Sequence, residues 1–158
     1  MDTESLRAME QITNCEFLYL NSLERVPFWG LRVVTQEMLP QGGPENLERD
    51  FEPKQADRIR ASLPLKRDPR RFEFVWKECV SYLVTNECYG KYPEPPELFE
   101  GKLFRVFSWS YLLEMSRKIT YASEEHPGPE PLQHFEIVCS DDVVDVIACM
   151  KPVIRQIT

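Results

Sequence analysis

The sequence predicts a single α+β domain over residues 1–158, a mostly antiparallel sheet with two or three helices packed mainly on one face. Two observations support this fold class. A chain of 158 residues has the usual size of one domain and can bury one compact core. Its apparent strands follow one another along the chain, whereas a parallel sheet requires strands that alternate regularly with helices.

The first elements are a short helix and two strands. Residues 3–12 carry Leu6, Met9 and Ile12 at helical spacing, with Asp2 or the threonine after it as the N-terminal cap. The segments CEFLYL and FWGLRVVTQEML then alternate apolar with polar residues, which is typical of half-buried strands. The sequence PQGGP ends the second strand.

The middle of the chain combines helices with a long alternating segment. Residues 44–63 predict a helix in two pieces, because a proline stands near the start of each piece. Residues 71–89 alternate far beyond the usual strand length of about 5–6 residues, so this segment must bend or fold back near Lys77 and Glu78. A bend is favoured, because these two residues are not typical of tight hairpin turns.

One more strand and one more helix follow a proline-rich loop, KYPEPPELFEG. KLFRVF is the predicted strand. SWSYLLEMSRKIT then offers a serine cap and the apolar residues Leu112, Met115 and Ile119, with basic residues at the end where the helix dipole favours cations.

The segment HFEIVCSDDVVDVIAC, residues 134–149, predicts an antiparallel hairpin whose tip is Asp141 and Asp142. This register gathers six apolar side chains on one face: Phe135, Ile137, Cys139, Val144, Val146 and Ala148. The other face, which includes Glu136 and Asp145, is then expected to face solvent.

A rival interpretation of the same segment is a DDxxD magnesium motif. That motif requires a helix, so that carboxylates four residues apart line one face of a large helical bundle. Here the aspartates are followed by β-branched residues, and the chain is too short for such a bundle. The sequence therefore favours the turn, and we expect no metal and no other cofactor.

The charge distribution favours a basic partner over a nucleic acid. The chain has 26 acids against 19 Lys and Arg residues, a net charge of −7, and residues 122–158 contain seven acids and two bases. Such a field repels phosphate backbones and attracts cationic partners. The only basic cluster, LKRDPRR, is interpreted as a solvated loop, because nucleic-acid binding usually requires a basic face as large as the domain.

Cysteine usage and hydropathy predict a cytoplasmic protein without a membrane span. The chain has five cysteines and no CxxC pair, and an odd number of cysteines cannot all pair within one chain. The N-terminal segment MDTESLRAME lacks the basic and apolar regions of a signal peptide. No stretch approaches the roughly 18 uninterrupted apolar residues of a membrane helix.

The predicted function is that of a small acidic cytoplasmic binding or regulatory protein, comparable to an immunity protein, that occupies the surface of a basic partner. The predicted contact residues are the acids of the C-terminal third: Glu136, Asp141, Asp142 and Asp145. No residue set predicts catalysis convincingly.

The alternative is an enzyme or small-ligand carrier with a pocket between the sheet and the helices of residues 44–63. This pocket would use Glu87, Cys88 or His134, because the chain has only two histidines and a cysteine nucleophile needs a nearby base.

Overall fold

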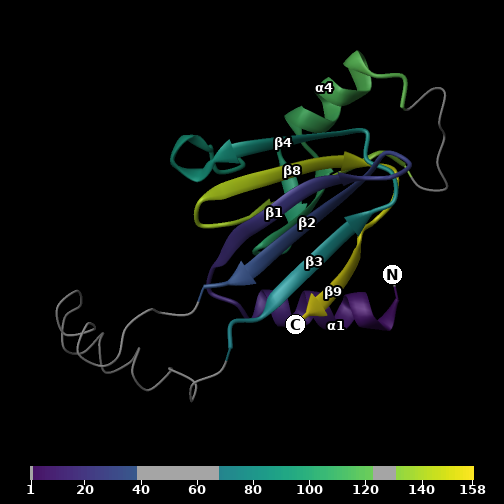
Figure 1. Ribbon diagram of the computed structural model, residues 1–158. Helices are drawn as coiled ribbons and strands as arrows, with labels where there is room; N and C mark the ends of the chain where they lie inside the picture. Colours follow the sequence, from purple (N-terminus) through teal and green to yellow (C-terminus); the bar gives the residue numbers. More distant parts are fainter. Residues whose placement is uncertain (1, 39–67, 123–130) are drawn as a thin grey trace, which may run out of the picture.

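The computed structural model describes residues 2–38, 68–122 and 131–158 (Figure 1). The predicted helices of residues 44–63 lie outside these ranges, and so does the pocket expected beside them. The predicted α+β class is confirmed, with the described strands divided between two antiparallel sheets.

The two sheets have simple strand orders. The four-stranded sheet has the order β1-β2-β3-β9, formed by Leu18–Val26, Gly30–Glu37, Arg71–Trp76 and Val153–Ile157. The five-stranded sheet has the order β4-β8-β7-β6-β5, formed by Ser81–Asn86, Asp142–Ala148, Gln133–Val138, Phe104–Trp109 and Leu98–Glu100. All of these strand pairs are antiparallel.

The main core lies where these sheets face each other. Aromatic side chains meet across the interface: the ring centroids of Phe74 and Phe104 are 5.4 Å apart, and those of Trp76 and Phe135 are 5.9 Å apart. Large aromatic rings contribute most of the buried apolar area in such a core. The sheets therefore have well-defined inner faces, and the outer face of each is left for other elements.

Two α-helices and one short 3₁₀ helix complete the described fold. They are α1 (Thr3–Thr13), η1 (Glu87–Tyr89) and α4 (Tyr111–Ile119). The predicted Asp2 cap is confirmed, since its carboxylate accepts the Ser5 N–H at 2.7 Å. Helix α1 lies beside β9 (Figure 1), and the Ser5 hydroxyl accepts the backbone N–H of Ile154 at 3.0 Å.

The buried faces of the helices match the predicted ones only in part. In helix α1, Ile12 is buried and Met9 packs against the core as predicted, but Leu6 is exposed, and Ser5 and Ala8 are buried in addition. Helix α4 has the predicted serine cap but buries Leu113 and Ser116, so its predicted apolar stripe lies largely outside the packed face: Met115 and Ile119 are exposed, and Leu112 is half-buried. The reason is that helical spacing alone does not define how a short helix is rotated against its sheet.

The long alternating segment of residues 71–89 bends as predicted. Strand β3 belongs to the four-stranded sheet and β4 to the five-stranded sheet, and residues 77–80 carry the chain from one sheet to the other. The two strands are not hydrogen-bonded to each other, so the segment is not a hairpin.

The hairpin of residues 134–149 is confirmed, but its predicted tip is wrong. Val138 lies opposite Val143, and the Cys139 N–H donates to the Asp142 carbonyl at 2.9 Å, which places Ser140 and Asp141 at the tip. The pairing differs from the predicted one by two residues. Because side chains alternate with a period of two, this shift keeps the predicted apolar face intact, and all six of its side chains are buried.

Contacts with β1 explain the position of the tip. The Ser140 N–H donates to the Leu18 carbonyl at 2.8 Å, and the Asp141 carboxylate accepts the Leu20 N–H at 3.3 Å. The tip is therefore held by a strand more than a hundred residues earlier in the chain, which no local pattern could indicate.

Candidate binding pocket

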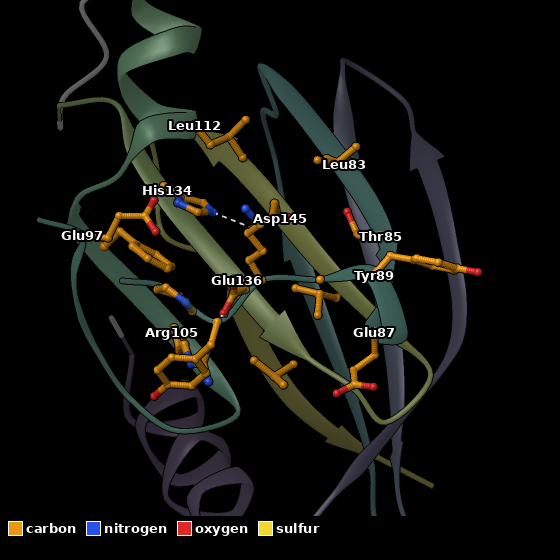
Figure 2. Close-up of a pocket in the computed structure, with 17 residues that line it drawn as sticks. Leu83, Thr85, Glu87, Tyr89, Glu97, Arg105, Leu112, His134, Glu136 and Asp145 are labelled. Atoms are coloured by element: carbon orange, nitrogen blue, oxygen red, sulfur yellow. Dashed lines mark hydrogen bonds and ion pairs between the residues drawn. The ribbon is translucent and has the colours of Figure 1, made fainter. Parts of the chain in front are cut away.

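A pocket of about 400 Å³ lies on the outer face of the five-stranded sheet. Strands β4, β6, β7 and β8 contribute to its lining, together with Leu112 of α4 and residues of η1 and the loop after it (Figure 2). This is the hairpin face that the sequence predicted to be exposed to solvent.

The prediction of a solvent-exposed face is wrong at its centre. His134 is 3% exposed and Glu136 is 6% exposed, and Asp145 is only partly accessible. Helix α4 approaches β7 on this side, and Tyr92 of the loop after η1 covers part of β6. Alternation in the hairpin reveals which side chains share a face, but it does not reveal that other segments cover that face.

Charged side chains form a row across three neighbouring strands of the pocket floor. Arg105 lies opposite Glu136 in the β6–β7 pair, and Glu136 lies opposite Asp145 in the β7–β8 pair. Arg105 Nη1 is 2.6 Å from Glu136 Oε1 in a buried ion pair. The Arg105 guanidinium also lies 4.8 Å from the ring centroids of both Tyr92 and Phe99.

Burial raises the pKa of the Glu136 carboxyl above its ordinary value, because a carboxylate loses its hydration there. Arg105 opposes this effect, and the negative charge of Asp145 reinforces it. The Arg105 guanidinium pairs with Glu136, whereas the hydrogen-bond partner of Asp145 is His134.

A series of hydrogen bonds links α4 to the pocket floor. His134 Nδ1 is 2.8 Å from Ser110 Oγ, and His134 Nε2 is 2.9 Å from Asp145 Oδ1. The Ser110 hydroxyl accepts the Leu113 N–H as the cap of α4 and keeps a proton and a second lone pair for the bond with Nδ1. The Asp145 carboxylate accepts, so Nε2 of His134 carries a proton.

Ser110, His134 and Asp145 have the composition of a catalytic triad, but the serine is not accessible. Ser110 is fully buried, caps a helix and does not line the pocket. A nucleophile must reach its substrate. The His134 ring is also stacked on Phe107, with ring centroids 4.2 Å apart. These contacts of His134 hold Asp145 in place at the pocket floor.

The structure divides the predicted site residues into separate groups. Glu87 and His134 line the pocket, whereas Cys88 is exposed and does not. Glu136 and Asp145 also line it, but the other two predicted contact acids, Asp141 at the hairpin tip and Asp142 at the start of β8, do not. The two ring nitrogens of His134 are hydrogen-bonded to Ser110 and Asp145, and neither of these bonds involves Cys88.

Three side chains that line the pocket were not among the predicted site residues. Arg105 lies at one end of the charged row, Tyr92 covers it, and Glu97 lines the pocket while accepting the Tyr111 N–H at 3.1 Å. A signal for Arg105 was present, because an arginine in the apolar strand KLFRVF requires a partner or solvent. The partner is identifiable only when the neighbouring strand is known.

The pocket lining is acidic overall. Four carboxylates contribute to it, from Glu87, Glu97, Glu136 and Asp145, against the two cations of Lys91 and Arg105. Figure 2 shows Glu97 and Glu87 on opposite sides of the floor, and Tyr89 directed away from His134.

Other sites for chemistry are limited in the described part of the chain. Residues 2–38, 68–122 and 131–158 contain no group of three or more His, Cys, Asp or Glu side chains placed to hold a metal ion. All five cysteines fall within these ranges, and none is in a disulfide. Burial raises the pKa of the Cys79 thiol to about 11 and that of Cys139 as well, whereas Cys88 is exposed.

No helix in the described ranges is both long and apolar enough to cross a membrane. Comparison of the chain with protein-family models, with curated proteins and with solved structures finds no significant match. The chemistry of the pocket itself is therefore the basis for any functional inference.

Proposed function

We propose that this chain is a small acidic binding protein of the cytoplasm that regulates a partner protein by receiving one of its basic side chains in the pocket. The observation that carries the proposal is the acidic lining of the pocket, where four carboxylates, including the neighbouring Glu136 and Asp145 of the floor, outnumber the two side chains of Lys91 and Arg105. An arginine or lysine side chain that enters the pocket would supply the missing positive charge.

The pocket is suited to a cation for two physical reasons. Glu136 and Asp145 are largely removed from water, so their attraction for a charge is screened less than that of surface acids. Tyr89 and Tyr92 also line the pocket, and tyrosine rings attract cations at their faces. Arginine fits both features, because its planar guanidinium can bind a carboxylate and stack on a ring.

Exposed aromatic residues support a protein as the source of this cation. Tyr89 and Tyr92 are both largely exposed. Tyrosines are enriched at the centres of protein interfaces, where they contribute large contact areas. The net charge of −7 would in addition steer a basic partner toward this surface.

A second candidate is a carrier for a free cationic small molecule. The volume of about 400 Å³ supports it, because small-molecule sites usually have volumes of roughly 300–1,000 Å³. Both candidates use the same carboxylates, so they differ only in whether contacts outside the pocket contribute to affinity.

A competition experiment tests the proposal and separates the candidates. A fluorescent arginine-containing peptide is titrated with the full chain, and N-acetyl-arginine amide is then added as competitor. Saturable binding that weakens with added salt is expected. If the blocked arginine competes only at much higher concentration than the unlabelled peptide, the partner protein is favoured; equal competition favours the carrier. Absence of saturable binding contradicts both.

A matched pair of variants locates the binding. Glu87 is an exposed lining residue, so Glu87→Gln should weaken peptide binding roughly threefold, as expected for one rim charge. Glu94→Gln changes an exposed acid of the neighbouring loop that does not line the pocket, and its binding should be unchanged. Equal effects of the two substitutions would indicate a diffuse electrostatic attraction instead of a pocket.

A further inference from the structure

Among the described residues, strand β4 is an edge of the five-stranded sheet that no further strand covers. The other edges among the described strands are protected in ways that discourage pairing with another chain. Strand β1 has a bulge between Leu20 and Ser22, β5 has only three residues and ends in Glu100, and β9 carries Arg155. Strand β4, with the sequence SYLVTN, has no charge, no proline and no break in its register.

Its apolar side chains are unusually accessible. Tyr82, Leu83 and Val84 are 40%, 50% and 40% exposed, whereas Val146 and Val144, which lie opposite Tyr82 and Val84 on β8, are fully buried. Figure 1 shows β4 beyond β8 at the margin of its sheet. Uncharged, β-branched and aromatic residues on an open edge are typical of strands that pair with a further strand.

The hydrogen-bond pattern shows which backbone groups point outward. The Glu87 N–H donates to the Asp141 carbonyl at 3.1 Å, in continuation of the β4–β8 register. Because residues of an antiparallel strand alternate between bonding one neighbour and the other, the N–H and C=O groups of Tyr82, Val84 and Asn86 are directed to the open edge. No described strand pairs with them there.

We propose that β4 pairs with β4 of a second copy of this chain, antiparallel across a two-fold axis. Only Tyr82, Val84 and Asn86 have backbone groups directed to the open edge, so these residues must lie opposite the same three residues of the second copy. The register with the most such pairs places Val84 opposite Val84 of the second copy, and Tyr82 opposite Asn86 of the second copy. The two sheets thereby join into one continuous ten-stranded sheet, because each has five strands.

The absence of charge in β4 makes this edge a place where two copies of the chain can meet. Two chains of net charge −7 repel each other over most of their surfaces. Strand β4 contains no charged residue, so identical edges can meet without placing like charges opposite each other.

An exposed aromatic pair extends this surface at one end of β4. Phe28 and Trp29, in the β1–β2 turn, are 90% and 67% exposed, and the Trp29 carbonyl accepts the Cys79 N–H at 3.0 Å shortly before β4 begins. Both have left-handed backbone conformations, with φ of 63° and 71°, which bulky residues rarely adopt. Strained residues of this kind are concentrated at functional surfaces.

The test is sedimentation of the full chain over a wide concentration range. The wild-type chain should shift reversibly from monomer to dimer as concentration rises. Val84→Lys places two lysines directly opposite each other and should raise the dissociation constant of the dimer by more than about tenfold. Val84→Thr keeps a β-branched, uncharged residue and should still dimerise. Leu98→Lys makes the same change on the exposed opposite edge, β5, and should also leave the dimer intact.

Amide hydrogen exchange in the wild-type chain provides a readout that does not depend on the folding of a variant. The amides of Tyr82, Val84 and Asn86 should become protected as concentration rises. A wild-type chain that is monomeric at every concentration overturns the proposal. This holds even if its β4 amides are protected, because that protection would then come from the same chain. A dimer that forms equally well with Val84→Lys and shows no concentration-dependent protection of β4 overturns it too.

Discussion

The substitution Arg105→Met removes the positive charge from the pocket floor and keeps much of the apolar length of the side chain. Arg105 Nη1 and Glu136 Oε1 are 2.6 Å apart, and the two side chains are only 11% and 8% exposed. Without the guanidinium, the Glu136 carboxylate loses its ion-pair partner and faces Asp145 across the strand pair, where Asp145 is hydrogen-bonded to His134.

Removal of one partner from a buried ion pair costs about 3–5 kcal/mol of unfolding free energy. We expect a loss of about 3 kcal/mol near neutral pH, at the lower end because both residues line a pocket that retains some contact with water. For a chain of this size, such a loss lowers Tm by roughly 6–12 °C.

The loss should depend on pH in a defined direction. Burial already raises the pKa of Glu136 above its ordinary value of 4.5, and Arg105 opposes that rise, so the substitution should raise the folded-state pKa further. Between the unfolded and folded pKa values the folded state then binds more protons, and the free energy of unfolding falls as pH increases through this range. Below pH 4.5 Glu136 is protonated in both states, and the cost of the substitution should shrink.

Urea unfolding at neutral and acidic pH measures these effects. Arg155→Met is the control, because Arg155 pairs with Glu4 at 3.7 Å between side chains that are 54% and 62% exposed, and its loss should cost less than about 1 kcal/mol. Adding Glu136→Gln to the Arg105→Met variant should recover stability, since glutamine carries no charge. A cost below about 1 kcal/mol for Arg105→Met at neutral pH, or an equal cost at acidic pH, would refute this reasoning.

Two further outcomes are expected. Ser110→Ala removes the cap of α4 and the hydrogen bond to His134, and it should lower the unfolding free energy by about 1–2 kcal/mol. Ser108→Ala changes an exposed serine and should cost less than about 0.5 kcal/mol. Equal effects of the two substitutions in urea unfolding would contradict the series of hydrogen bonds through Ser110. Alkylation of the native chain near pH 8, followed by mass spectrometry, should modify Cys88 first, because the other cysteines are buried. Modification of all five cysteines at one rate would contradict that burial.

Local patterns predicted what depends on neighbouring residues. The alternation of residues 134–149 identified the hairpin and its buried face, and the cap positions of both α-helices were visible in the sequence. These features depend on the period of a strand or on a side chain bonding its own helix. The hairpin tip was displaced because contacts with Leu18 and Leu20, far away in the chain, determine its position.

The pocket could be predicted only in part. Glu87 and His134 were predicted as pocket residues from their side-chain chemistry, and both line the pocket. The burial of Glu136 was unpredictable from the hairpin, because Arg105 and the residues that cover this face come from other segments. A carboxylate on a strand faces solvent by default, and only the order of strands in the sheet shows that a guanidinium lies opposite it.

Binding of a cation at the outer face of the five-stranded sheet is the central functional claim, and amide-resolved NMR spectra test it most directly. The full chain is titrated with N-acetyl-arginine amide, and the position of every shifted backbone amide is recorded. We expect saturable shifts at His134, Glu136 and Asp145 that diminish as salt is added, while Phe72 and Phe74 in the other sheet do not shift. Shifts that do not saturate, or that are largest in the four-stranded sheet, would contradict a cation-binding pocket at this face.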